Sequence, residues 1–368
     1  MIKRENMMGE VNHTDALVVG AGIAGLTAAV CLHDAGLRVH VLEGATRIGG
    51  RVLGIRAAGS TSDIADLGPT WVWPQWQPVA RKWIMQLSLD QFAQNDTGDG
   101  ILDGFGGGPQ RHPIPAQDGI ARLVGGPSSI VAALASRLPT GAIITDAQVT
   151  AITTLGDRLG LTTKAGTIKT AKQVILATPL RVTEENVEIE NLPPELRAAM
   201  RVVPTWMAQQ AKVIAIYPSP FWRDQGLSGR VASRSGPLVE IHDHTPADEK
   251  AGALFGFVGW GAGARQSDPQ GLRAAILDQL VRCFGNKAAT PVQLVIQDWA
   301  QDPLVCSLRD LQEPPTHPAV GSTILRHGHL GGRLWLACSE TAEQSPGLIE
   351  GALIAGSSAA RKVVAALH

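Results

Sequence analysis

Residues 15–43, DALVVGAGIAGLTAAVCLHDAGLRVHVLE, decide the fold. The first five residues, 15–19, predict a short buried strand, and the pattern G-x-G-x-x-G follows directly. The apolar run 26–32 predicts a helix, and RVHVLE at 38–43 predicts a second strand that ends in an acid. Strand, glycines, helix, strand and terminal acid in this order predict a βαβ dinucleotide-binding unit, and a ligand-free glycine-rich helix start is the weaker interpretation.

The glycines and the acid of this unit each have a physical task. Gly20 permits the tight turn after the strand, Gly22 lets the backbone approach a pyrophosphate, and Gly25 permits close contact between helix and strand. The helix N-terminus supplies amide donors and the positive end of the helix dipole. Glu43 is placed to accept hydrogen bonds from ribose hydroxyls. The predicted cofactor contacts here are Gly20, Gly22, Ile23, Ala24, Gly25, Glu43 and Gly44.

Composition favours a folded protein with a small-molecule partner. The chain has 368 residues and 44 % hydrophobic content, which allow a large core and two domains. Its 32 basic and 33 acidic residues are dispersed, so we expect neither a nucleic acid nor an anionic membrane as partner. The uncharged run 16–32 falls just short of a membrane span, and its glycine spacing has the explanation given above.

We recognise no targeting signal in residues 1–15 and no spacing of Cys or His residues that predicts a metal site. Residues 1–15 carry charges and no apolar segment, so we expect a cytoplasmic protein without signal peptide or anchor. The four cysteines are far apart and form no C-x-x-C pair. Two His-x-His pairs, at 242/244 and 327/329, lack further ligands at a suggestive spacing, so no metal site is predicted.

Two segments after Glu43 identify the dinucleotide. The first, GATRIGGRV at 44–52, contains R-x-G-G-R, and the second is DLGPTWV at 66–72. Together they resemble the FAD-binding segments of the flavin-containing amine oxidase family, which includes monoamine, polyamine and L-amino acid oxidases. The resemblance implies that Arg51 approaches the FAD phosphates and that 67–71 lies along the flavin. The implied contacts are Arg47, Gly49, Gly50, Arg51, Gly68, Pro69, Thr70 and Trp71.

The same chemistry is reasonable without the resemblance. Glycines expose backbone amides, and a guanidinium pairs well with a diphosphate. Surface ion pairs formed by Arg47 and Arg51 are the alternative interpretation.

The resemblance extends to the C-terminus. A helix over 125–138 and short strands over 142–178 follow the family's order, which places the backbone of Val149 at the adenine. Residues 332–364 look like the family's closing strand, loop and helix, with Glu340 in the loop that holds the ribityl chain. The helix start, at Gly347, Leu348 and Ile349, then points at the pyrimidine end of the flavin, where it would stabilise an anionic reduced flavin.

The resemblance implies an α/β fold with a discontinuous Rossmann-type FAD-binding domain of the GR2-like kind. Its predicted segments are 1–78, 122–181 and 298–368. Residues 79–121 and 182–297 are predicted to form a second, α+β substrate domain on a mixed sheet.

Two glycine-rich stretches outside the fingerprint are predicted to be loops. The stretch NDTGDGILDGFGGGPQ, 95–110, predicts a flexible loop and a shortened substrate cap. GWGAGA, 259–264, matches G-x-G-x-x-A, but the following RQSDPQ predicts no helix, so we interpret it as a turn and not as a second nucleotide site.

Lys212 is the first candidate catalytic residue. It lies in AKVIAIY, 211–217, on the strand face shared by Ile214 and Ile216. Taken alone, it is a strand-end lysine that extends to water. In the family this lysine reaches a water at flavin N5 and assists flavin reoxidation, and a lysine directed into an apolar cavity usually marks function. We therefore predict a flavin-side role.

Trp299 is the second candidate, as a flat wall beside the flavin. It matches a family tryptophan in QDWAQDP, with Trp71, Trp73 and Trp76 as alternatives, and plain core packing explains each equally well. Many amine oxidases of the family hold the substrate nitrogen between two aromatic rings, often both tyrosine, but Tyr217 is the only tyrosine in this chain. Strand parity turns it away from Lys212, and the ring position of the monoamine oxidases is Leu348 here.

These residues predict an FAD-dependent oxidase that removes a hydride from a C–N bond of a small amine or amino-acid-like substrate. The products are an imine and H2O2, with O2 or an electron carrier as acceptor. The spacing around Cys306 differs from that of members with covalent FAD, so noncovalent FAD is predicted. The alternatives are a desaturase or oxidase of a C–C or ring bond in an apolar substrate, or a flavin-binding protein with little turnover. The sequence does not predict an oligomeric state.

Overall fold

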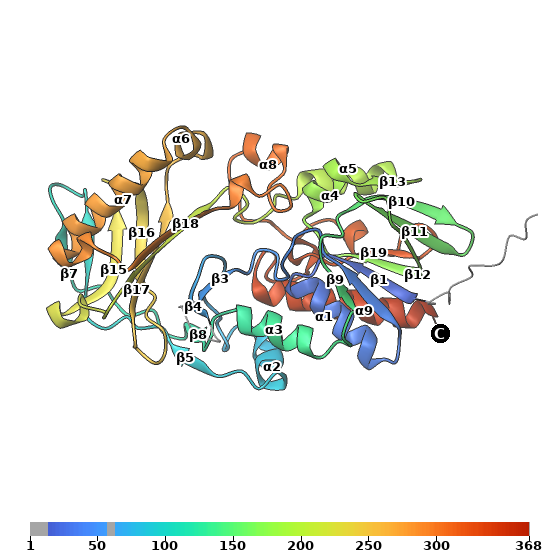
Figure 1. Cartoon of the computed structure of the whole chain (residues 1–368), viewed down its shortest axis with the longest axis horizontal. Coiled ribbons are helices and arrows are strands. Elements are labelled where there is room, and N and C mark those ends of the chain that lie inside the picture. Colours follow the sequence, from blue (N-terminus) through green and yellow to red (C-terminus); the bar gives the residue numbers. More distant parts are fainter. Residues whose placement is uncertain (1–13, 57–62, 368) are drawn as a thin grey trace, which may run out of the picture.

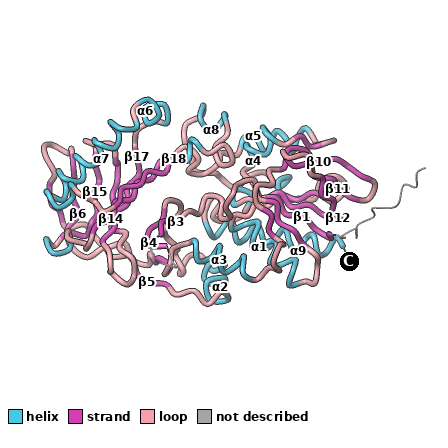
Figure 2. Tube along the Cα trace, in the orientation of Figure 1, coloured by secondary structure: helices cyan, strands magenta, loops and turns pink. Residues whose placement is uncertain are grey.

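The computed structural model describes residues 14–56 and 63–367. The expectation for the N-terminal segment therefore lies mostly outside the described residues. The chain forms two lobes side by side, each built on one large sheet, as Figures 1 and 2 show. The predicted fold, a Rossmann-type α/β unit with a second unit on a mixed sheet, is confirmed.

The first lobe contains an eight-stranded sheet in the order β13-β10-β11-β12-β1-β2-β9, and β19 also pairs with β12. Strands β1, β2, β9, β12 and β19 are parallel to one another where they pair, and β10 and β11 add an antiparallel hairpin. The strands are β1 (Thr14–Val19), β2 (Val39–Leu42), β9 (Ile143–Ile144), β10 (Val149–Leu155), β11 (Arg158–Thr163), β12 (Ile168–Leu176), β13 (Glu188–Ile189) and β19 (Leu334–Leu336).

Both faces of this sheet are covered, which explains why residues 16–19 of β1 are all apolar. Ala16 and Val18 pack against the helices drawn below the sheet in Figure 1, and Leu17 and Val19 contact the opposite layer. The lower helices are α1 (Ile23–Asp34), α2 (Pro78–Gln86), α3 (Ser128–Ser136) and α9 (Ile349–Leu367), and the upper layer contains α4 (Leu180–Asn186) and α5 (Pro194–Val202).

The second lobe contains a seven-stranded sheet in the order β18-β14-β17-β16-β15-β6-β7. Only β15 and β6 pair in parallel, so the sheet is mixed. Its strands are β6 (Asp99–Asp103), β7 (Gln110–His112), β14 (Ala211–Tyr217), β15 (Leu227–Ser233), β16 (Leu238–Asp243), β17 (Gly252–Val258) and β18 (Gln293–Asp298).

The two faces of β14 have different neighbours. Val213, Ala215 and Tyr217 pack with α7 (Pro269–Phe284), which covers the outer face in Figure 1. Ile214 and Ile216 point the other way, toward Leu67 and the first lobe. Lys212 shares their face by the two-residue period of a strand, so β14 directs it toward the space between the lobes.

Short elements connect the two sheets. Two small antiparallel ladders join β3 (Gly54–Arg56) to β4 (Asp63–Asp66) and β5 (Gln91–Ala93) to β8 (Ala121–Leu123). The remaining helices are α6 (Ala262–Ser267), α8 (Leu308–Gln312), η1 (Arg223–Gln225), η2 (Asn286–Ala289), η3 (Trp299–Gln301), η4 (Thr323–Arg326) and η5 (Ser339–Thr341). Within the described ranges, no helix combines the length and the apolar character needed to cross a membrane.

Two loop predictions were wrong. The stretch 95–110 contains β6 and begins β7, because Ile101 is buried in the core of the second lobe and β6 pairs with β15. Its glycines form the turn between these strands, with Gly104 at φ +78°. A helix also begins within GWGAGA, since α6 runs from Ala262 to Ser267 and includes the start of RQSDPQ. The strand before it, β17, pairs in antiparallel fashion with both of its neighbours, so this is not a βαβ unit.

The predicted domain boundaries remain a prediction. Within the segment predicted as 182–297, β13 pairs with β10 of the first sheet. Leu196 and Met200 of α5 pack in the same core as β10 to β12.

Candidate active site

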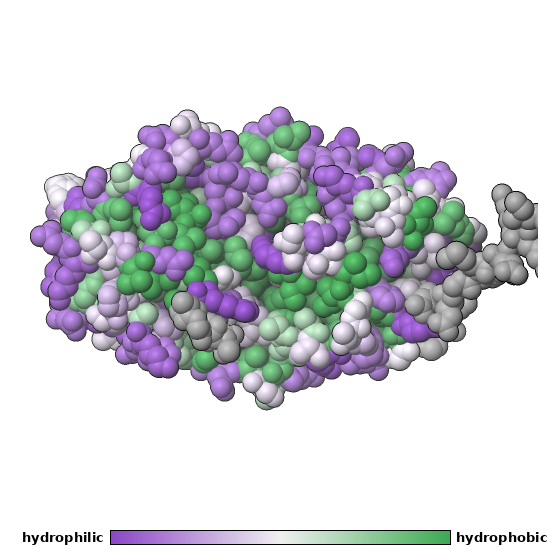
Figure 3. All heavy atoms as spheres, in the orientation of Figure 1, coloured by the Kyte–Doolittle hydropathy of each residue, from purple (hydrophilic) through white to green (hydrophobic). Residues whose placement is uncertain are grey.

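A cavity of about 650 Å³ lies between the two lobes, with lining residues from both. Figure 3 shows apolar side chains gathered in the middle of this face of the molecule and polar residues around its outline. All predicted site residues line the cavity except Gly25 and Glu340. The lining members are Gly20, Gly22, Ile23, Ala24, Glu43, Gly44, Arg47, Gly49, Gly50, Arg51, Gly68, Pro69, Thr70, Trp71, Val149, Lys212, Trp299, Gly347, Leu348 and Ile349.

The start of α1 forms one end of the cavity. Gly22 is the N-cap, no side chain caps the helix, and its first turn contains no acid. The first amides of a helix have no partner within it, so they form an anion-binding group here. A Cβ at Gly22 would meet only Gly49 O, at 3.8 Å, and would project into the cavity.

Gly25 lies behind this surface and has a packing role. A Cβ there would lie 1.9 Å from Gly20 O, a separation that no real contact shows. Only glycine therefore allows α1 to approach the turn after β1 so closely, as the fingerprint predicts.

Glu43 and Arg47 organise the loops at this end. The Glu43 carboxylate accepts hydrogen bonds from Ala21 N at 2.6 Å and Ala45 N at 2.8 Å. The Arg47 guanidinium donates to three backbone carbonyls of residues 48–52, among them that of Gly50 at 2.8 Å. Both side chains thus shape the glycine-rich wall that they also line.

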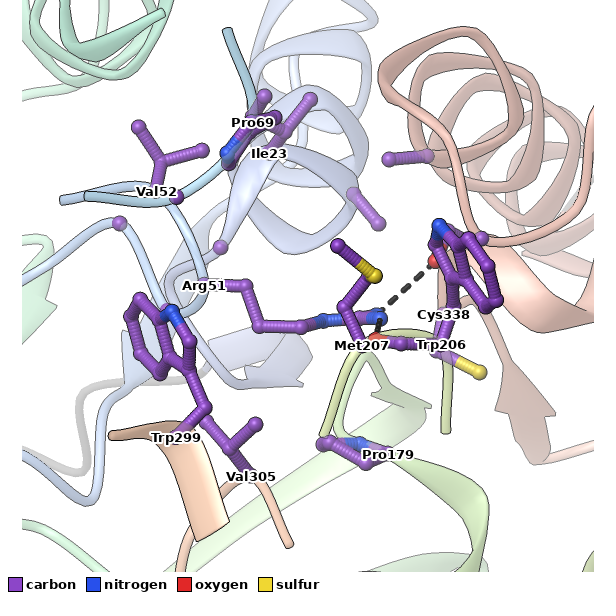
Figure 4. Close-up of a pocket in the computed structure, with 18 of the residues that line it drawn as sticks. Ile23, Arg51, Val52, Pro69, Pro179, Trp206, Met207, Trp299, Val305 and Cys338 are labelled. Carbon is purple, nitrogen blue, oxygen red and sulfur yellow. Dashed lines mark hydrogen bonds between the residues drawn. The ribbon is translucent and has the colours of Figure 1, made fainter. Parts of the chain in front are cut away.

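Arg51 extends across the cavity wall and joins segments that are far apart in the sequence. Its guanidinium donates to both carboxylate oxygens of Glu340, at 2.6 and 3.0 Å. It also donates to Ser339 Oγ at 3.0 Å and to Trp206 O at 3.1 Å, the two bonds drawn in Figure 4. Burial opposes ionisation of Glu340, but the adjacent Arg51 outweighs it and holds the pKa of Glu340 below its usual value. The structure therefore places Glu340 behind Arg51, outside the lining.

The start of α9 is fixed by a second buried acid. Glu350 is 1 % exposed, and its carboxylate accepts hydrogen bonds from Val79 N and Ala80 N in the first turn of α2. Gly347, just before α9, has φ +82°, and a Cβ there would lie 2.8 Å from Trp206 Cβ. These contacts hold the first turn of α9 against the cavity.

Lys212 is buried at the other end of the cavity, with 2 % exposure. Its Nζ donates to Gly68 O at 2.9 Å and to Thr70 Oγ1 at 2.5 Å, and lies 4.3 Å from the centroid of the Phe255 ring. Burial lowers the pKa of Lys212 from 10.5 to about 7, against the opposing attraction of Asp66. The lysine thus connects the strand β14 to the segment predicted to lie along the flavin.

A buried polar cluster behind Lys212 was not predicted from the sequence. Asp66 lies at the end of β4; its backbone N–H donates to His244 Nε2 at 2.9 Å, and its carboxylate lies 3.2 Å from the same nitrogen. Arg122 donates to the carbonyls of His244 and Thr245. Burial raises the pKa of Asp66 to about 6, with Lys212 and Arg122 opposing the rise. Burial also lowers the pKa of His244, so the imidazole is neutral.

Aromatic rings form the wall beside Lys212. Trp71 packs edge-on against Phe255, with centroids 5.4 Å apart, and Phe255 packs against Phe257 at 5.5 Å. Trp299 lines the cavity from η3 and donates from Nε1 to Leu67 O at 3.1 Å. Tyr217 packs on the outer face of the sheet with Phe221, as strand parity predicts.

Two cysteines lie near the cavity. Cys338 lines it, and burial raises the pKa of its thiol. Cys306 packs against Ala208 and Trp299, and burial raises its pKa to about 12. Both thiols are therefore protonated and unreactive at neutral pH.

Several lining residues could not be recognised as such from the sequence. They come from the loop before β14 and from the inner faces of β16 and β17: Trp206, Met207, Gln210, Val239, Glu240, Phe255 and Phe257. The alternation of Phe255 and Phe257 in GALFGFV does place both on one face of a strand. The sequence does not show that this strand, β17, pairs with β14, which carries Lys212.

Comparisons with known proteins identify the family. The flavin containing amine oxidoreductase model matches residues 105–364, and an NAD(P)-binding Rossmann-like domain model matches residues 18–87. The chain belongs to the flavin-containing amine oxidoreductase family. FAD is the cofactor of this family.

Named relatives are only distantly similar to the chain. It is 28 % identical over 263 residues to a probable flavin-containing monoamine oxidase A of Dictyostelium discoideum, with 70 % of this chain and 54 % of the relative covered. It is 29 % identical over 256 residues to the putative flavin-containing monoamine oxidase AofH of Mycobacterium tuberculosis, with 67 % and 53 % covered. The chain therefore spans about half the length of these two relatives.

Solved structures support the fold. Cyclohexylamine oxidase from Brevibacterium oxydans has a TM-score of 0.81 to this chain at 20 % identity, and the match covers 96 % of this chain and 99 % of that one.

The residues present fit FAD. The cavity has an uncapped helix start and a glycine surface at Gly22 that a Cβ would fill, which together suit a pyrophosphate. Glu43 lies where an adenosine ribose is expected, and Val149 also lines the cavity. The segment 67–71 and the start of α9 line the cavity toward Lys212, where an isoalloxazine ring would be held.

Proposed function

We propose that the chain is an FAD-dependent oxidase that removes a hydride from the carbon of a C–N bond in a small amine, giving an imine and H2O2. The observation that carries the proposal is the position of Lys212. It is buried, it lines the cavity, and it bonds to Gly68 O and Thr70 Oγ1, in the segment expected to lie along the flavin. A lysine in such a place is costly unless it serves a molecule in the cavity.

FAD, when bound, supplies the hydride acceptor that the side chains of a protein lack. The chain's own groups would bind the FAD and orient it. The start of α1 would hold the pyrophosphate, Glu43 the ribose, and the segment 67–71 one side of the flavin. Arg51 is fixed by Glu340, and it remains directed along the cavity wall, where it would add a positive charge near the diphosphate.

Lys212 would hold a proton or a water beside the reacting atoms. An ammonium has three donors, and two are used by Gly68 O and Thr70 Oγ1, which leaves one for the cavity. The lowered pKa of Lys212 limits the positive charge near an amine that must bind in its neutral form. No further general base is needed when the amine enters deprotonated.

The aromatic wall would position the substrate carbon. Trp71, Phe255 and Phe257 form flat apolar surfaces in place of a tyrosine pair, and Trp299 lines the same cavity. Their packing excludes water from the reacting carbon, which protects the imine until it is released. Noncovalent binding of FAD is part of the proposal, because both nearby thiols are kept protonated by burial.

The test is anaerobic reduction of the purified protein. We expect a yellow protein whose flavin absorbance is bleached by at least one amine of a panel and recovers on addition of air, with release of H2O2. Lys212→Met should slow the recovery by tenfold or more, because it removes the proton-holding group but keeps the side-chain volume. An unchanged rate of recovery would remove Lys212 from the mechanism.

Failure of every amine to bleach the flavin would overturn the substrate assignment. An apolar compound that copurifies with such a protein would favour oxidation of a C–C or ring bond.

A further inference from the structure

Arg122, on β8, is a buried cation that the proposed mechanism does not use. The residue is 4 % exposed, and its guanidinium donates to the carbonyls of His244 and Thr245. Within the described part of the chain, its Nε has no hydrogen-bond partner. An arginine keeps its proton even when it is buried, so Arg122 adds a permanent positive charge whose field acts on Lys212.

Asp66 is the acid that serves both Arg122 and Lys212. Its charge acts on each of these cations, and their charges act on it. The other acid that acts on Arg122 is Asp243, and both oxygens of its carboxylate accept hydrogen bonds from Arg223. One carboxylate therefore serves two buried cationic groups, and an excess charge in such a place is costly.

His244 adds no charge to this cluster. Its Nε2 accepts the backbone N–H of Asp66 at 2.9 Å, so this nitrogen holds no proton. Above pH 6, Asp66 is ionised and balances the charge of Arg122. Lys212 is then the member that can lose its charge, because an arginine cannot. The other charged or titratable groups that act on members of the cluster are Asp63, Arg223 and His242.

The hydrogen bonds of Lys212 suit a neutral amine. Its Nζ donates to Gly68 O and to Thr70 Oγ1. A neutral amine has two hydrogens and one lone pair, so both hydrogens are used and the lone pair remains. Because Lys212 lines the cavity, this lone pair can accept a proton from a molecule bound there. The Phe255 ring, centred 4.3 Å from Nζ, would stabilise the ammonium once it has formed.

We propose that Arg122 and Asp66 are positioning residues that keep Lys212 a neutral amine in the resting protein, so that Lys212 takes the proton that an ammonium substrate must lose. This inference rests on the proposed function. A small alkylamine is largely an ammonium in neutral solution, and only its neutral form releases a hydride readily from the adjacent carbon. Transfer of one N–H proton from the substrate to Nζ leaves a neutral amine beside the ammonium of Lys212, with no change in total charge.

The same proton balances the second half of the reaction. A hydride carries one proton and two electrons, whereas reduction of O2 to H2O2 consumes two protons and two electrons. The ammonium of Lys212 supplies the second proton and becomes a neutral amine again. Overall, RCH2NH3+ and O2 give RCH=NH2+ and H2O2 without exchange of a proton with the solvent.

The first measurement is the charge of Lys212 in the FAD-loaded protein. Lysine labelled with 13C at Cε gives an NMR signal whose shift reports loss of the ammonium proton, and Lys212→Met identifies the signal. Arg122→Gln removes the buried positive charge but keeps one donor for the carbonyls, and Arg122→Lys keeps the charge. Arg111 is exposed on the second lobe, so Arg111→Gln controls for the loss of one positive charge.

We expect Lys212 to be neutral at pH 8 in wild type, in Arg122→Lys and in Arg111→Gln. The midpoint of its titration should rise by about one pH unit in Arg122→Gln and fall by about one pH unit in Asp66→Asn. Loosened packing alone would expose Lys212 and raise the midpoint in both variants. A wild-type Lys212 that keeps its proton at pH 8, or shifts of the same sign in the two variants, would overturn the proposal.

The second measurement counts protons as 2-amino-2-methylbutane binds to the FAD-loaded protein. The amine-bearing carbon of this ligand carries no hydrogen, so no hydride can be removed. Calorimetric titration at pH 8 in buffers of different ionisation enthalpy gives the number of protons released. Wild type should release about half a proton or less, and Lys212→Met about one, because the variant has no group to take the proton. Equal release by both proteins would contradict the role of Lys212 as the proton acceptor.

The two proposals can fail separately. A neutral Lys212 with shifts of opposite sign, in a protein that oxidises no amine, contradicts only the proposed reaction. Oxidation of amines by a protein whose Lys212 stays charged at pH 8 contradicts only the role of Arg122 and Asp66.

Discussion

The two ends of the cavity are built in different ways. At the α1 end, the cavity wall is largely backbone: glycines at 20, 22, 49 and 50, uncapped amides and a helix start, most of them within one continuous stretch of chain. At the Lys212 end, the wall consists of side chains from β14, β17, η3 and the segment 67–71. The first end is suited to a cofactor that does not change, and the second can be altered one side chain at a time without disturbing the first.

The sharpest way to test this difference is a pair of glycine substitutions at the α1 end. Gly25→Ala should lower the free energy of unfolding by about 4 kcal/mol and abolish flavin binding, because its Cβ would lie 1.9 Å from Gly20 O. Chemical denaturation of the flavin-free protein measures the loss of stability.

Gly22→Ala is the matched control. Its Cβ would enter the open cavity, so flavin affinity should fall while the stability of the flavin-free protein stays within about 0.5 kcal/mol of wild type. Equal loss of stability in both variants would contradict the separate packing and binding roles.

The next largest effect is expected at the ion pair between Arg51 and Glu340. Glu340→Ala leaves the Arg51 guanidinium without its bidentate partner and should cost about 3 kcal/mol of stability. Glu340→Gln keeps the side-chain volume and one acceptor, and should cost about half as much. Thermal unfolding at a fixed excess of FAD compares both variants with wild type, and a glutamine variant as stable as wild type would show that the charge on Glu340 contributes nothing.

The smallest effect is expected at the Lys212 end, as a dependence of stability on pH. The pKa of Lys212 is lowered from 10.5 in the unfolded chain to about 7 in the folded one, so burying its charge destabilises the fold. The cost is full below pH about 7. Between pH 7 and 10.5 the unfolded chain holds a proton that the folded chain lacks, so stability of the wild type rises with pH.

Lys212→Met removes this dependence. Its stability relative to wild type should decrease by about 2 kcal/mol as the pH is raised from 7 to 9, as measured by urea denaturation at each pH. Asp66→Asn should lower the pKa of Lys212 further, because it removes the opposing attraction, and so should extend the rise of stability with pH to values below pH 7. A pH-independent difference between Lys212→Met and wild type would show that the lysine is not protonated in the unfolded and neutral in the folded chain over this range.

The same contrast explains which features the sequence could predict. The α1 end is local, so glycine spacing, strand and terminal acid were enough to place Gly22 and Glu43. Lys212 was placed by strand parity together with the family resemblance, and the parity of Tyr217 was predicted correctly. The cluster behind Lys212 was not predicted, because Asp66 of β4 and His244 after β16 belong to different sheets and meet through a hydrogen bond between residues 178 positions apart.

The error over 95–110 has a related cause. The composition of that stretch is that of a loop, but the burial of Ile101 against β15 overrides the local preference. Tertiary contacts of this kind leave no periodic trace in a five-residue strand. Glu240 of the lining was missed for the same reason, since its place on the cavity depends on the order of the strands β14, β17 and β16.

The bond between Arg51 and Glu340 spans 289 positions of the chain, and α9 packs along α1 so closely that a Cβ at Gly356 would lie 2.2 Å from Ala24 O. During synthesis on a ribosome, the fingerprint emerges long before the segment around Glu340 and α9 that packs against it. The first helix and the glycine loop therefore lack these contacts until the chain has been made past α9. Tight binding of FAD at the proposed site is then expected only after α9 has packed against α1.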